Sequence, residues 1–348
     1  MVHPAVLLSI NFAHLDLFKA DILILDCLIF TNYIERSISM KQILYILLTL
    51  GIGAIFASNL GLDYFGSKKC SCGPNSNCCG PVSRQQRPID ARAQENKQQN
   101  DVVKNTVKEA YTQVAQEGGC CSLFGGGCCG GGADLSEYIG YSKEELEELG
   151  DANLGLGCGN PVNLGEFKDG FTVLDLGSGA GLDCFLAAKK VGPTGMIIGV
   201  DMTPEMIEKA RENAQKYKIE NVEFRLGDIE NLPVASNSID IIMSNCVINL
   251  APDKDKVFEE AARVLKNGGK MYVSDVVLLG ELSDEQKNDT NLLCACVSGA
   301  LLKDTYLAKL KTVGFEIEIV GEDLEIGKKW FQNDELPISS LKFVAIKK

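Results

Sequence analysis

The segment from Met243 to Asp253 reads MSNCVINLAPD and places Cys246 where an apolar, strand-like run gives way to a loop. A buried cysteine on a strand is usually just a small apolar side chain. At the end of a strand it can instead face a ligand, because parallel sheets bind ligands beyond the carboxyl ends of their strands. Whether Cys246 packs or reacts depends on which other residues the fold brings to that edge.

Two more cysteines stand in segments able to cover the same edge. Cys158 lies in the glycine-rich stretch DANLGLGCGNP, and Cys296 lies in NLLCACVSGALL. Three thiolates from separate segments suit a soft, thiophilic centre. Zinc is the obvious competitor, but a structural zinc site requires a fourth ligand. The histidines, His3 and His14, both lie at the extreme N-terminus and cannot complete such a site.

A glycine turn marks a cofactor site. In VLDLGSGAGLD, Gly177, Gly179 and Gly181 allow a tight strand-to-helix turn whose backbone comes close to a ligand. Asp201 ends the next predicted strand at the spacing expected of a ribose-binding acid. These features fit a nicotinamide dinucleotide as well as S-adenosylmethionine.

Two further acids favour the second ligand. Asp175 places a carboxylate beside the turn, where a cationic ligand is attracted and a pyrophosphate is repelled. Asp228, in GDIENLP after the third predicted strand, stands where an adenine amino group can be recognised. The site therefore favours a cationic adenosine derivative over a dinucleotide.

Strand and helix patterns alternate from Phe171 onward, which predicts an α/β fold with a doubly wound, seven-stranded, mostly parallel sheet. The predicted strands are FTVLDLG, MIIGVDM, VEFRLGD, IDIIMSNC, KMYVSDVV, FEIEIVGE and SLKFVAIKK. The helices between them include LDCFLAAKKVG, TPEMIEKARENAQKYK with Thr203 as its cap, and DKVFEEAARVLKNGG. A helical insertion is expected around residues 281–313.

The combination of DLGSGAG, VDM and GDIENLP resembles the class I S-adenosylmethionine methyltransferases. The resemblance implies that Asp201 holds the ribose, that Asp228 and Ile229 face the adenine, and that the glycine turn faces the methionine part. Asn245 ends the fourth strand, which in this family faces the methyl group. The donor-site residues implied are Asp175, Gly177, Gly179, Gly181, Asp201, Met202, Asp228, Ile229 and Asn245.

A closer resemblance, to the arsenite methyltransferase family, covers about residues 101–348. It is carried by GLGCGNP, VLDLGSGAGLDCFLAAKKVG, VDMTPEMIEKARENA, SNCVINLAPDK, RVLKNGGKMYVSD and CVSGAL. The resemblance implies that trivalent arsenic, the substrate, is held by thiolates of Cys158, Cys246 and Cys296. CVSGAL aligns at Cys296 better than at Cys294. Leu156 departs from the pattern, since many relatives have an aromatic residue there.

The resemblance also implies a further cysteine, nearer the N-terminus, that takes part in redox turnover. The match leaves four candidates open: Cys120, Cys121, Cys128 and Cys129. An external thiol such as glutathione or thioredoxin is the expected final reductant. Cys184, on the first helix after the glycine turn, is expected to pack rather than react.

Two other functions fit part of the sequence. One is a class I methyltransferase for a carbon, oxygen or nitrogen acceptor, with the cysteines merely packed. The other is a thiol-rich, metalloid-sequestering protein that carries an inactive methyltransferase fold. The intact glycines, Asp201 and Asp228 argue against the second function.

Composition narrows the partners and the compartment. A net charge of -13 and a pI near 4.8 argue against a nucleic-acid partner. The chain has 14 cysteines, and they accompany long apolar strands and helices, which favours a reducing, cytoplasmic environment over a disulfide-stapled fold. We expect a monomer.

The chain divides into four predicted regions. Residues 1–69 include the uncharged run 43–62, which is long enough to cross a bilayer and is a candidate membrane anchor with the catalytic part facing the cytosol. The alternative is that Met40 is the start and that residues 1–39 are an upstream translation never made in the cell. Residues 70–100 read as a flexible linker bearing Cys70, Cys72, Cys78 and Cys79. Residues 101–168 read as a helical, Gly/Cys-rich cap that contributes to the arsenic site, and 169–348 as the methyltransferase domain.

Overall fold

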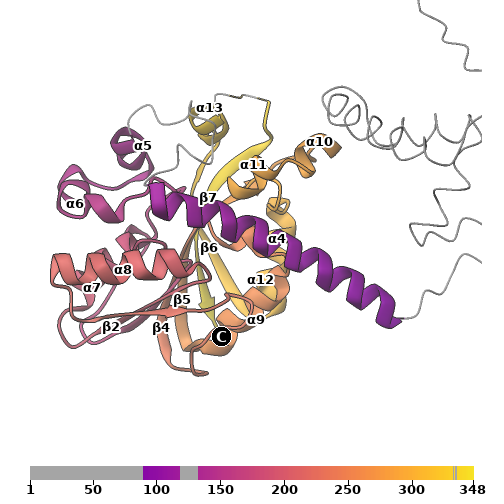
Figure 1. The fold of residues 1–348 in the computed structure, drawn as a ribbon. Helices are drawn as coiled ribbons and strands as arrows, with labels where there is room; N and C mark the ends of the chain where they lie inside the picture. Colours follow the sequence, from indigo (N-terminus) through magenta and orange to yellow (C-terminus); the bar gives the residue numbers. More distant parts are fainter. Residues whose placement is uncertain (1–88, 118–131, 332, 334) are drawn as a thin grey trace, which may run out of the picture. The chain divides into compact units, whose positions relative to one another are not determined.

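One seven-stranded sheet organises the part of the chain that the structure describes (Figure 1). The structure is a computed structural model and describes residues 89–117, 132–331, 333 and 335–348. The strands are β1 (Thr172–Leu176), β2 (Met196–Asp201), β3 (Val222–Leu226), β4 (Ile239–Asn245), β5 (Leu265–Leu278), β6 (Phe315–Asp323) and β7 (Ile338–Lys347). Their order is β3-β2-β1-β4-β5-β7-β6, and β7 alone runs antiparallel to its neighbours. The predicted seven-stranded, mostly parallel sheet is confirmed.

Helices cover both faces of this sheet. On one face lie α7 (Leu182–Val191) and α8 (Pro204–Tyr217), and on the other lie α9 (Lys254–Val264) and α12 (Lys303–Thr312). Successive side chains of β1 point to opposite faces of the sheet and so reach the helices on both sides. Val173 packs in the cluster with α7, while Leu174 and Leu176 pack in the cluster with α9 and α12. The strands buried on both faces leave their carboxyl ends as the place for a ligand.

Shorter elements cap the sheet and form the insertion. They are α5 (Gly132–Ile139), α6 (Lys143–Glu148), α10 (Asp284–Lys287), α11 (Thr290–Cys294), α13 (Ile326–Phe331) and the 3-10 turns η3 (Gly150–Ala152), η4 (Pro161–Asn163) and η5 (Ile248–Leu250). Helix α6 starts with a capping box, in which Ser142 and Glu145 exchange side-chain hydrogen bonds of 2.8 and 3.2 Å with each other's backbone N–H. Thr203 occupies the N-cap of α8, but its side chain makes no capping hydrogen bond.

Helix α4 (Ile89–Glu117) begins earlier than the sequence predicts, so the assignment of 89–100 to a flexible linker is wrong. The segment IDARAQENKQQN combines alanine and glutamine with single arginine, glutamate and lysine residues, all of which favour a helix without needing a buried face. Further along, Val107 and Val114 are buried at the predicted helical spacing. Figure 1 shows α4 lying across the molecule, where it packs against α8, α11 and η5.

The helix predicted to run to Gly269 ends earlier. Helix α9 stops at Val264, and Leu265 already pairs with Ile239 as the start of β5. Gly268 has a φ of 76°, a left-handed conformation that an α-helix cannot contain. The glycines therefore form an irregular turn inside the β5 segment, which resumes regular pairing with β4 from Lys270.

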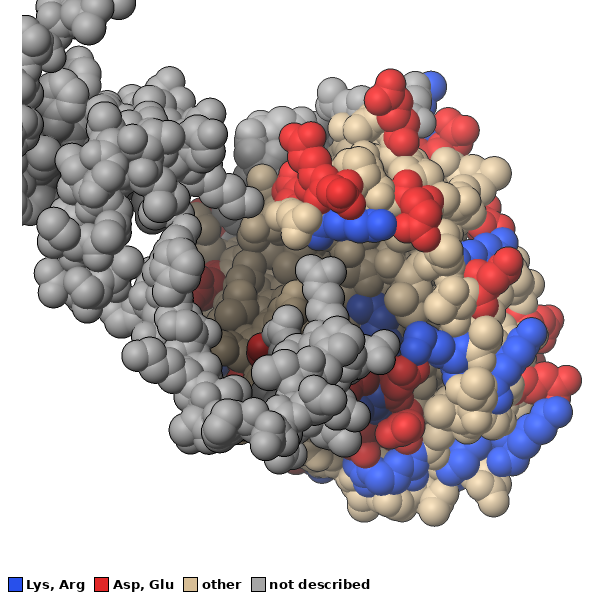
Figure 2. Space-filling view, turned by 90° about the vertical axis from the view of Figure 1, so that its right-hand side faces the viewer, with Lys and Arg blue, Asp and Glu red and all other residues tan. Residues whose placement is uncertain are grey.

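Charged side chains of both signs are interspersed on the face shown in Figure 2. Among the described residues, several pair across elements, such as Lys309 with Asp255 at 2.6 Å. This face offers no broad basic area to a phosphate backbone among the residues that the structure describes.

Candidate active site

A cavity lies at the carboxyl edge of the sheet, bounded by the ends of β1, β2 and β4 and by α4. Most of the predicted donor-site residues line it, as does Cys246. They are Asp175, Gly177, Gly179, Asp201, Met202, Asp228, Ile229 and Asn245. The cavity therefore unites the donor-site residues with one of the three predicted arsenic ligands.

Gly181 is the exception, because it does not line this cavity. Its φ is 98°, and a Cβ built there would lie 2.6 Å from the ring of Phe185. This glycine is needed for the close start of α7 rather than for ligand contact. Gly177, with a φ of 65°, does line the cavity, and its N–H is already used by the carbonyl of Val200 at 2.8 Å.

The carboxylate of Asp201 is held in place by two backbone donors. The N–H of Gly179 donates to Oδ2 at 3.0 Å and the N–H of Thr203 donates to Oδ1 at 2.8 Å. Burial raises the pKa of Asp201, and these hydrogen bonds act against that rise. Each carboxylate oxygen keeps a further lone pair, so the group can still accept hydrogen bonds from two ribose hydroxyls.

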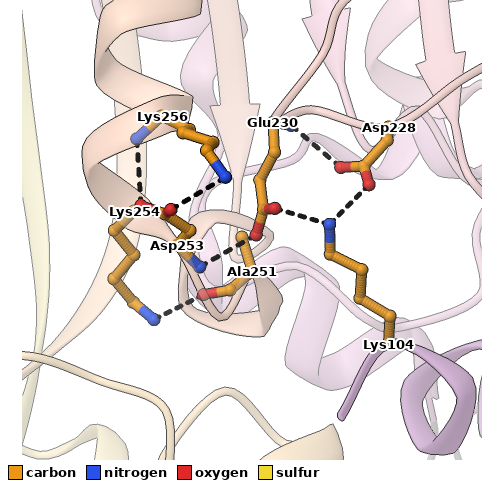
Figure 3. Close-up of polar contacts among 7 residues, drawn as sticks. All are labelled: Lys104, Asp228, Glu230, Ala251, Asp253, Lys254 and Lys256. Carbon is orange, nitrogen blue, oxygen red and sulfur yellow. Dashed lines mark hydrogen bonds and ion pairs between the residues drawn. The ribbon is translucent and has the colours of Figure 1, made fainter. Parts of the chain in front are cut away.

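Lys104 of α4 reaches the acids at the predicted adenine end (Figure 3). Its Nζ lies 2.6 Å from Oδ2 of Asp228 and 2.5 Å from Oε2 of Glu230. The other carboxylate oxygen of Glu230 accepts the N–H of Asp253 at 2.8 Å. These contacts tie α4 to the rim of the cavity. Sequence reasoning had no ground to select Lys104, because a lysine on a polar helix face normally points to solvent.

Two buried acids, Asp175 and Asp183, also line the cavity. Burial raises the pKa of Asp183 to about 6, although the hydroxyl of Tyr141 donates to its Oδ1 at 2.7 Å. Burial and the neighbouring Asp183 raise the pKa of Asp175 well above its usual range. The thiol of Cys184 donates to Asp175 at 3.2 Å and is fully buried, in keeping with the predicted packing role. Such a pair stabilises a cationic ligand, whose charge would favour ionisation of both acids.

Asn245 connects the donor cavity to the thiols. Its Oδ1 accepts the N–H of Cys158 at 2.9 Å, and its Nδ2 donates to the carbonyl of Gly159 at 2.8 Å and to Asp183 at 3.1 Å. A Cβ built at Gly157 would lie 2.5 Å from that same amide nitrogen. The glycine-rich GLGCGNP loop thus fits closely over the end of β4, and this fit places Cys158 beside Cys246.

The three predicted arsenic ligands meet in one buried cluster. Cys158, Cys246 and Cys296 are 1%, 3% and 2% exposed. The sulfur atoms of Cys158 and Cys246 lie within 4.8 Å of each other, and the thiol of Cys296 donates to the carbonyl of Cys246 at 2.6 Å. Cys294 packs in a different apolar cluster, with Val114 of α4. Of the two neighbouring cysteines, Cys296 and not Cys294 thus shares the buried cluster of Cys158 and Cys246.

The pKa values of the three thiols are all raised, which keeps the free thiols protonated and neutral. Burial raises the pKa of Cys158 well above its usual range. For Cys246 the hydrogen bond with Cys158 lowers the pKa, but the hydrogen bond with Cys296 and burial together raise it well above that range. The hydrogen bond with Cys246 lowers the pKa of Cys296, but burial together with the charges of Asp275 and the neighbouring cysteines raises this pKa by more, so it is also raised overall. A ligand that binds here must remove or accept three protons.

Comparison with known proteins gives the family. Residues 167–324 match the family Methyltransf_31, described as a methyltransferase domain. An arsenite methyltransferase from Halobacterium salinarum is 49% identical over 228 residues, which are 62% of this chain and 58% of that protein. The human arsenite methyltransferase is 40% identical over 168 residues, 46% of this chain and 44% of that protein. This chain belongs to the arsenite methyltransferase family.

The likeness does not extend over the whole of those relatives. The chain spans about half the length of the curated arsenite methyltransferases that it matches. Among solved structures, an arsenic(III) S-adenosylmethionine methyltransferase from Chlamydomonas reinhardtii is 32% identical, with a TM-score of 0.48 and coverage of 62% of this chain and 73% of that one.

In this member of the arsenite methyltransferase family, two of the converging cysteines have strained backbones. Cys246 has a φ of 58° and Cys296 a φ of 63°, both in the left-handed region. For a residue with a side chain this conformation costs about 1–2 kcal/mol. Such strain persists where the surrounding structure fixes it, and it is frequent at functional sites.

A fourth polar group, Asp275 of β5, also belongs to the thiol cluster of this arsenite methyltransferase relative. Its carboxylate and the sulfur atoms of Cys158 and Cys246 all lie within 4.8 Å of one another. Asp275 is fully buried, and burial raises its pKa to about 7. Sequence reasoning missed it, although an acid within the apolar strand VSDVV is a signal that could have found it.

Several predictions made from the sequence lie outside the described residues. They include the candidate anchor 43–62, the linker cysteines Cys70, Cys72, Cys78 and Cys79, and the redox candidates Cys120, Cys121, Cys128 and Cys129. Within the described ranges, no helix is both long enough and apolar enough to span a bilayer.

Proposed function

We propose that this protein transfers a methyl group from S-adenosylmethionine to trivalent arsenic held by Cys158, Cys246 and Cys296. The observation that carries the proposal is that thiols from three separated segments meet at the wall of the donor cavity. Cys246 belongs to both, since it lines the cavity and packs in one buried cluster with the other two cysteines. Arsenic bound to this set would therefore lie next to the donor.

The residues present fit S-adenosylmethionine. Asp201, fixed by two backbone N–H groups, would hold the ribose hydroxyls, and Asp228 with Ile229 would face the adenine. Asp175 and Asp183 are two buried acids that suit the positive charges of the methionine part. When bound, the donor supplies a methyl group that its sulfonium already activates. The protein therefore does not need to provide a strong acid or base.

Binding of arsenous acid to the three thiols needs no added base. Arsenous acid and three thiols give three arsenic–sulfur bonds, and the three thiol protons leave with the hydroxides as three water molecules. Raised thiol pKa values are compatible with this exchange, because no thiolate has to form in advance. Three sulfur ligands leave arsenic with a pyramidal geometry and a lone pair. The buried cluster excludes water and fixes the direction of that lone pair.

Methyl transfer to the lone pair takes arsenic from the trivalent to the pentavalent state, so a return to the trivalent state needs two electrons. Two thiols can supply them by forming a disulfide. We propose that one of Cys120, Cys121, Cys128 and Cys129 takes part, and that an external thiol such as glutathione or thioredoxin restores the reduced state. Each of these four cysteines is substituted in turn, and each variant is tested in a single-turnover and a multiple-turnover assay. The variant that lacks the participating cysteine should complete the first turnover but not later ones.

The test of the proposed function is arsenic speciation after incubation with arsenite, donor and thiol. Wild-type protein should give methylated arsenicals. Cys246→Ser should lower the rate by about a hundredfold or more, because the substrate loses its central ligand, while donor affinity measured by calorimetry stays unchanged. Cys296→Ala and Cys294→Ala form a matched pair, of which only the first should lose activity. Full activity of Cys246→Ser would contradict the assignment and favour an acceptor bound elsewhere.

We further propose a monomer whose catalytic unit faces the cytosol, where the donor is found. Fractionation of cells that express the chain from Met1 or from Met40 tests the tether. Membrane recovery of both forms supports an anchor within 43–62, and recovery of neither form with membranes excludes it. Light scattering of the purified chain tests the oligomeric state.

A further inference from the structure

The thiol cluster contains four protein donors, although trivalent arsenic uses three. Sulfur atoms of Cys158 and Cys246 lie within 4.8 Å of each other and of a carboxylate oxygen of Asp275. The thiol of Cys296 lies beside this group, where it contacts the thiol of Cys246 and donates to the carbonyl of Cys246 at 2.6 Å. All four side chains are buried, so none of these donors is a surface group that happens to lie nearby.

A set of three sulfurs and one oxygen matches a different class of ligand. Zinc prefers four ligands in a tetrahedron and accepts thiolates at about 2.3 Å together with carboxylates at about 2.1 Å. Sulfur ligands in such a tetrahedron are about 3.8 Å apart, so Cys158, Cys246 and Asp275, whose donor atoms already lie within 4.8 Å of one another, need only a small contraction. The thiol of Cys296 has to turn away from the carbonyl of Cys246 to complete the set. Sequence reasoning set zinc aside because a fourth ligand was missing, and the fold supplies that ligand from β5.

The carboxylate is oriented as a ligand would be. Oδ1 of Asp275 accepts hydrogen bonds from Nδ2 of Asn249 at 2.9 Å and from the N–H of Val276 at 3.0 Å. Oδ2 accepts one from the hydroxyl of Tyr306 at 3.1 Å. Three of the four lone-pair sites of the carboxylate are thus used, and one on Oδ2 remains for a cation. Outer hydrogen bonds of this kind hold ligating carboxylates in place at metal sites.

We propose that Cys158, Cys246, Cys296 and Asp275 form a tetrahedral site for a thiophilic divalent cation, zinc above all. The cation binds three thiolates and one carboxylate, and the displaced thiol protons pass to solvent. It occupies the position of arsenic, so each excludes the other. The carboxylate of Asp275 distinguishes zinc binding from arsenic binding, because arsenic needs only the three sulfurs.

The experiment measures alkylation of individual cysteines of the full-length, reduced chain, resolved by peptide mass spectrometry, with zinc ion alone as the probe. Zinc should slow alkylation of Cys246 at least tenfold and leave Cys184, a buried thiol outside the set, unaffected. In Asp275→Asn the zinc concentration needed for this protection should rise about tenfold or more. Equal protection of wild type and Asp275→Asn would overturn the proposal. This readout uses neither arsenite nor donor, so its outcome is independent of the proposed methylation.

Two further measurements keep the test decisive. Arsenite should protect Cys246 in Asp275→Asn at a concentration within about twofold of wild type, since a three-sulfur ligand set does not include the carboxylate. If the variant does not fold, zinc-edge anomalous diffraction from wild-type crystals gives the answer directly. A zinc peak bonded to Asp275 and the three sulfurs supports the site, and a peak bonded only to cysteines overturns it.

Discussion

The donor half and the thiol half of the site are built in different ways. The donor half uses short stretches that follow consecutive strands, such as the glycine turn with Asp175 and the Asp201–Met202 pair. The thiol half draws Cys158, Cys246 and Cys296 from segments that lie far apart in the chain. A site that follows one strand end can be recognised locally, whereas a convergent site depends on the whole topology.

The two halves also treat backbone strain differently. In the donor half a glycine, Gly177, takes the left-handed conformation without a steric penalty. In the thiol half Cys246 and Cys296 take the same conformation with a side chain, at a cost of about 1–2 kcal/mol each. The difference indicates that a thiol, and not only a turn, is required at these two positions.

Asn245 connects the two halves of the site, so removing its side chain should affect both halves at once. Asn245→Ala loses the hydrogen bonds to Cys158 and Gly159 on one side and to Asp183 on the other. We expect the affinities for donor and for arsenite to fall together. The methylation rate should fall by about 10-fold to 100-fold. Calorimetry with each ligand measures the two effects. A loss confined to one ligand would show that the halves are independent.

Asp275 should make the thiol half a source of pH-dependent stability. Its pKa is about 7 in the folded protein and near 3.8 when exposed, so between these values the folded state holds a proton that the unfolded state releases. Stability therefore falls as pH rises through this window, by up to about 1.4 kcal/mol per pH unit. In Asp275→Asn this contribution disappears, and the fall from about pH 4.5 to 6.5 should be shallower.

Denaturant titrations of wild type and Asp275→Asn over that pH range measure the difference in slope. Asp183, with a pKa of about 6, acts with the same sign but is present in both proteins, so it cancels in the comparison. Parallel stability curves would mean that Asp275 does not carry a raised pKa.

The smallest predicted effect concerns α4, which closes the donor half. Lys104→Met removes the contacts with Asp228 and Glu230, and donor release should become about two- to fivefold faster, as expected for a half-exposed ion pair. Salt should accelerate release from wild type but not from the variant. Lys108→Met, one turn further along α4 at an exposed position, is the control. Unchanged release from Lys104→Met would show that the ion pair does not hold the helix in place.

Sequence reasoning reached the sheet and the donor half because periodicity and glycine spacing are local properties. It also selected the three converging cysteines, but from a family resemblance and not from periodicity. It missed Asp183, Asp275 and Lys104, since each owes its place to contacts between distant elements. The start of α4 was missed for another reason: helix formers on a solvated surface leave no apolar pattern to recognise.

The most direct test of the convergent thiol site is arsenic-edge anomalous diffraction from crystals of the protein grown with arsenite and the demethylated donor product. Unlike a binding assay, it separates these thiols from the other cysteines among the 14 in the chain. We expect one ordered arsenic peak bonded to the sulfurs of Cys158, Cys246 and Cys296, with its open side toward the donor cavity. A peak bonded to other cysteines, or to fewer than these three, would contradict it.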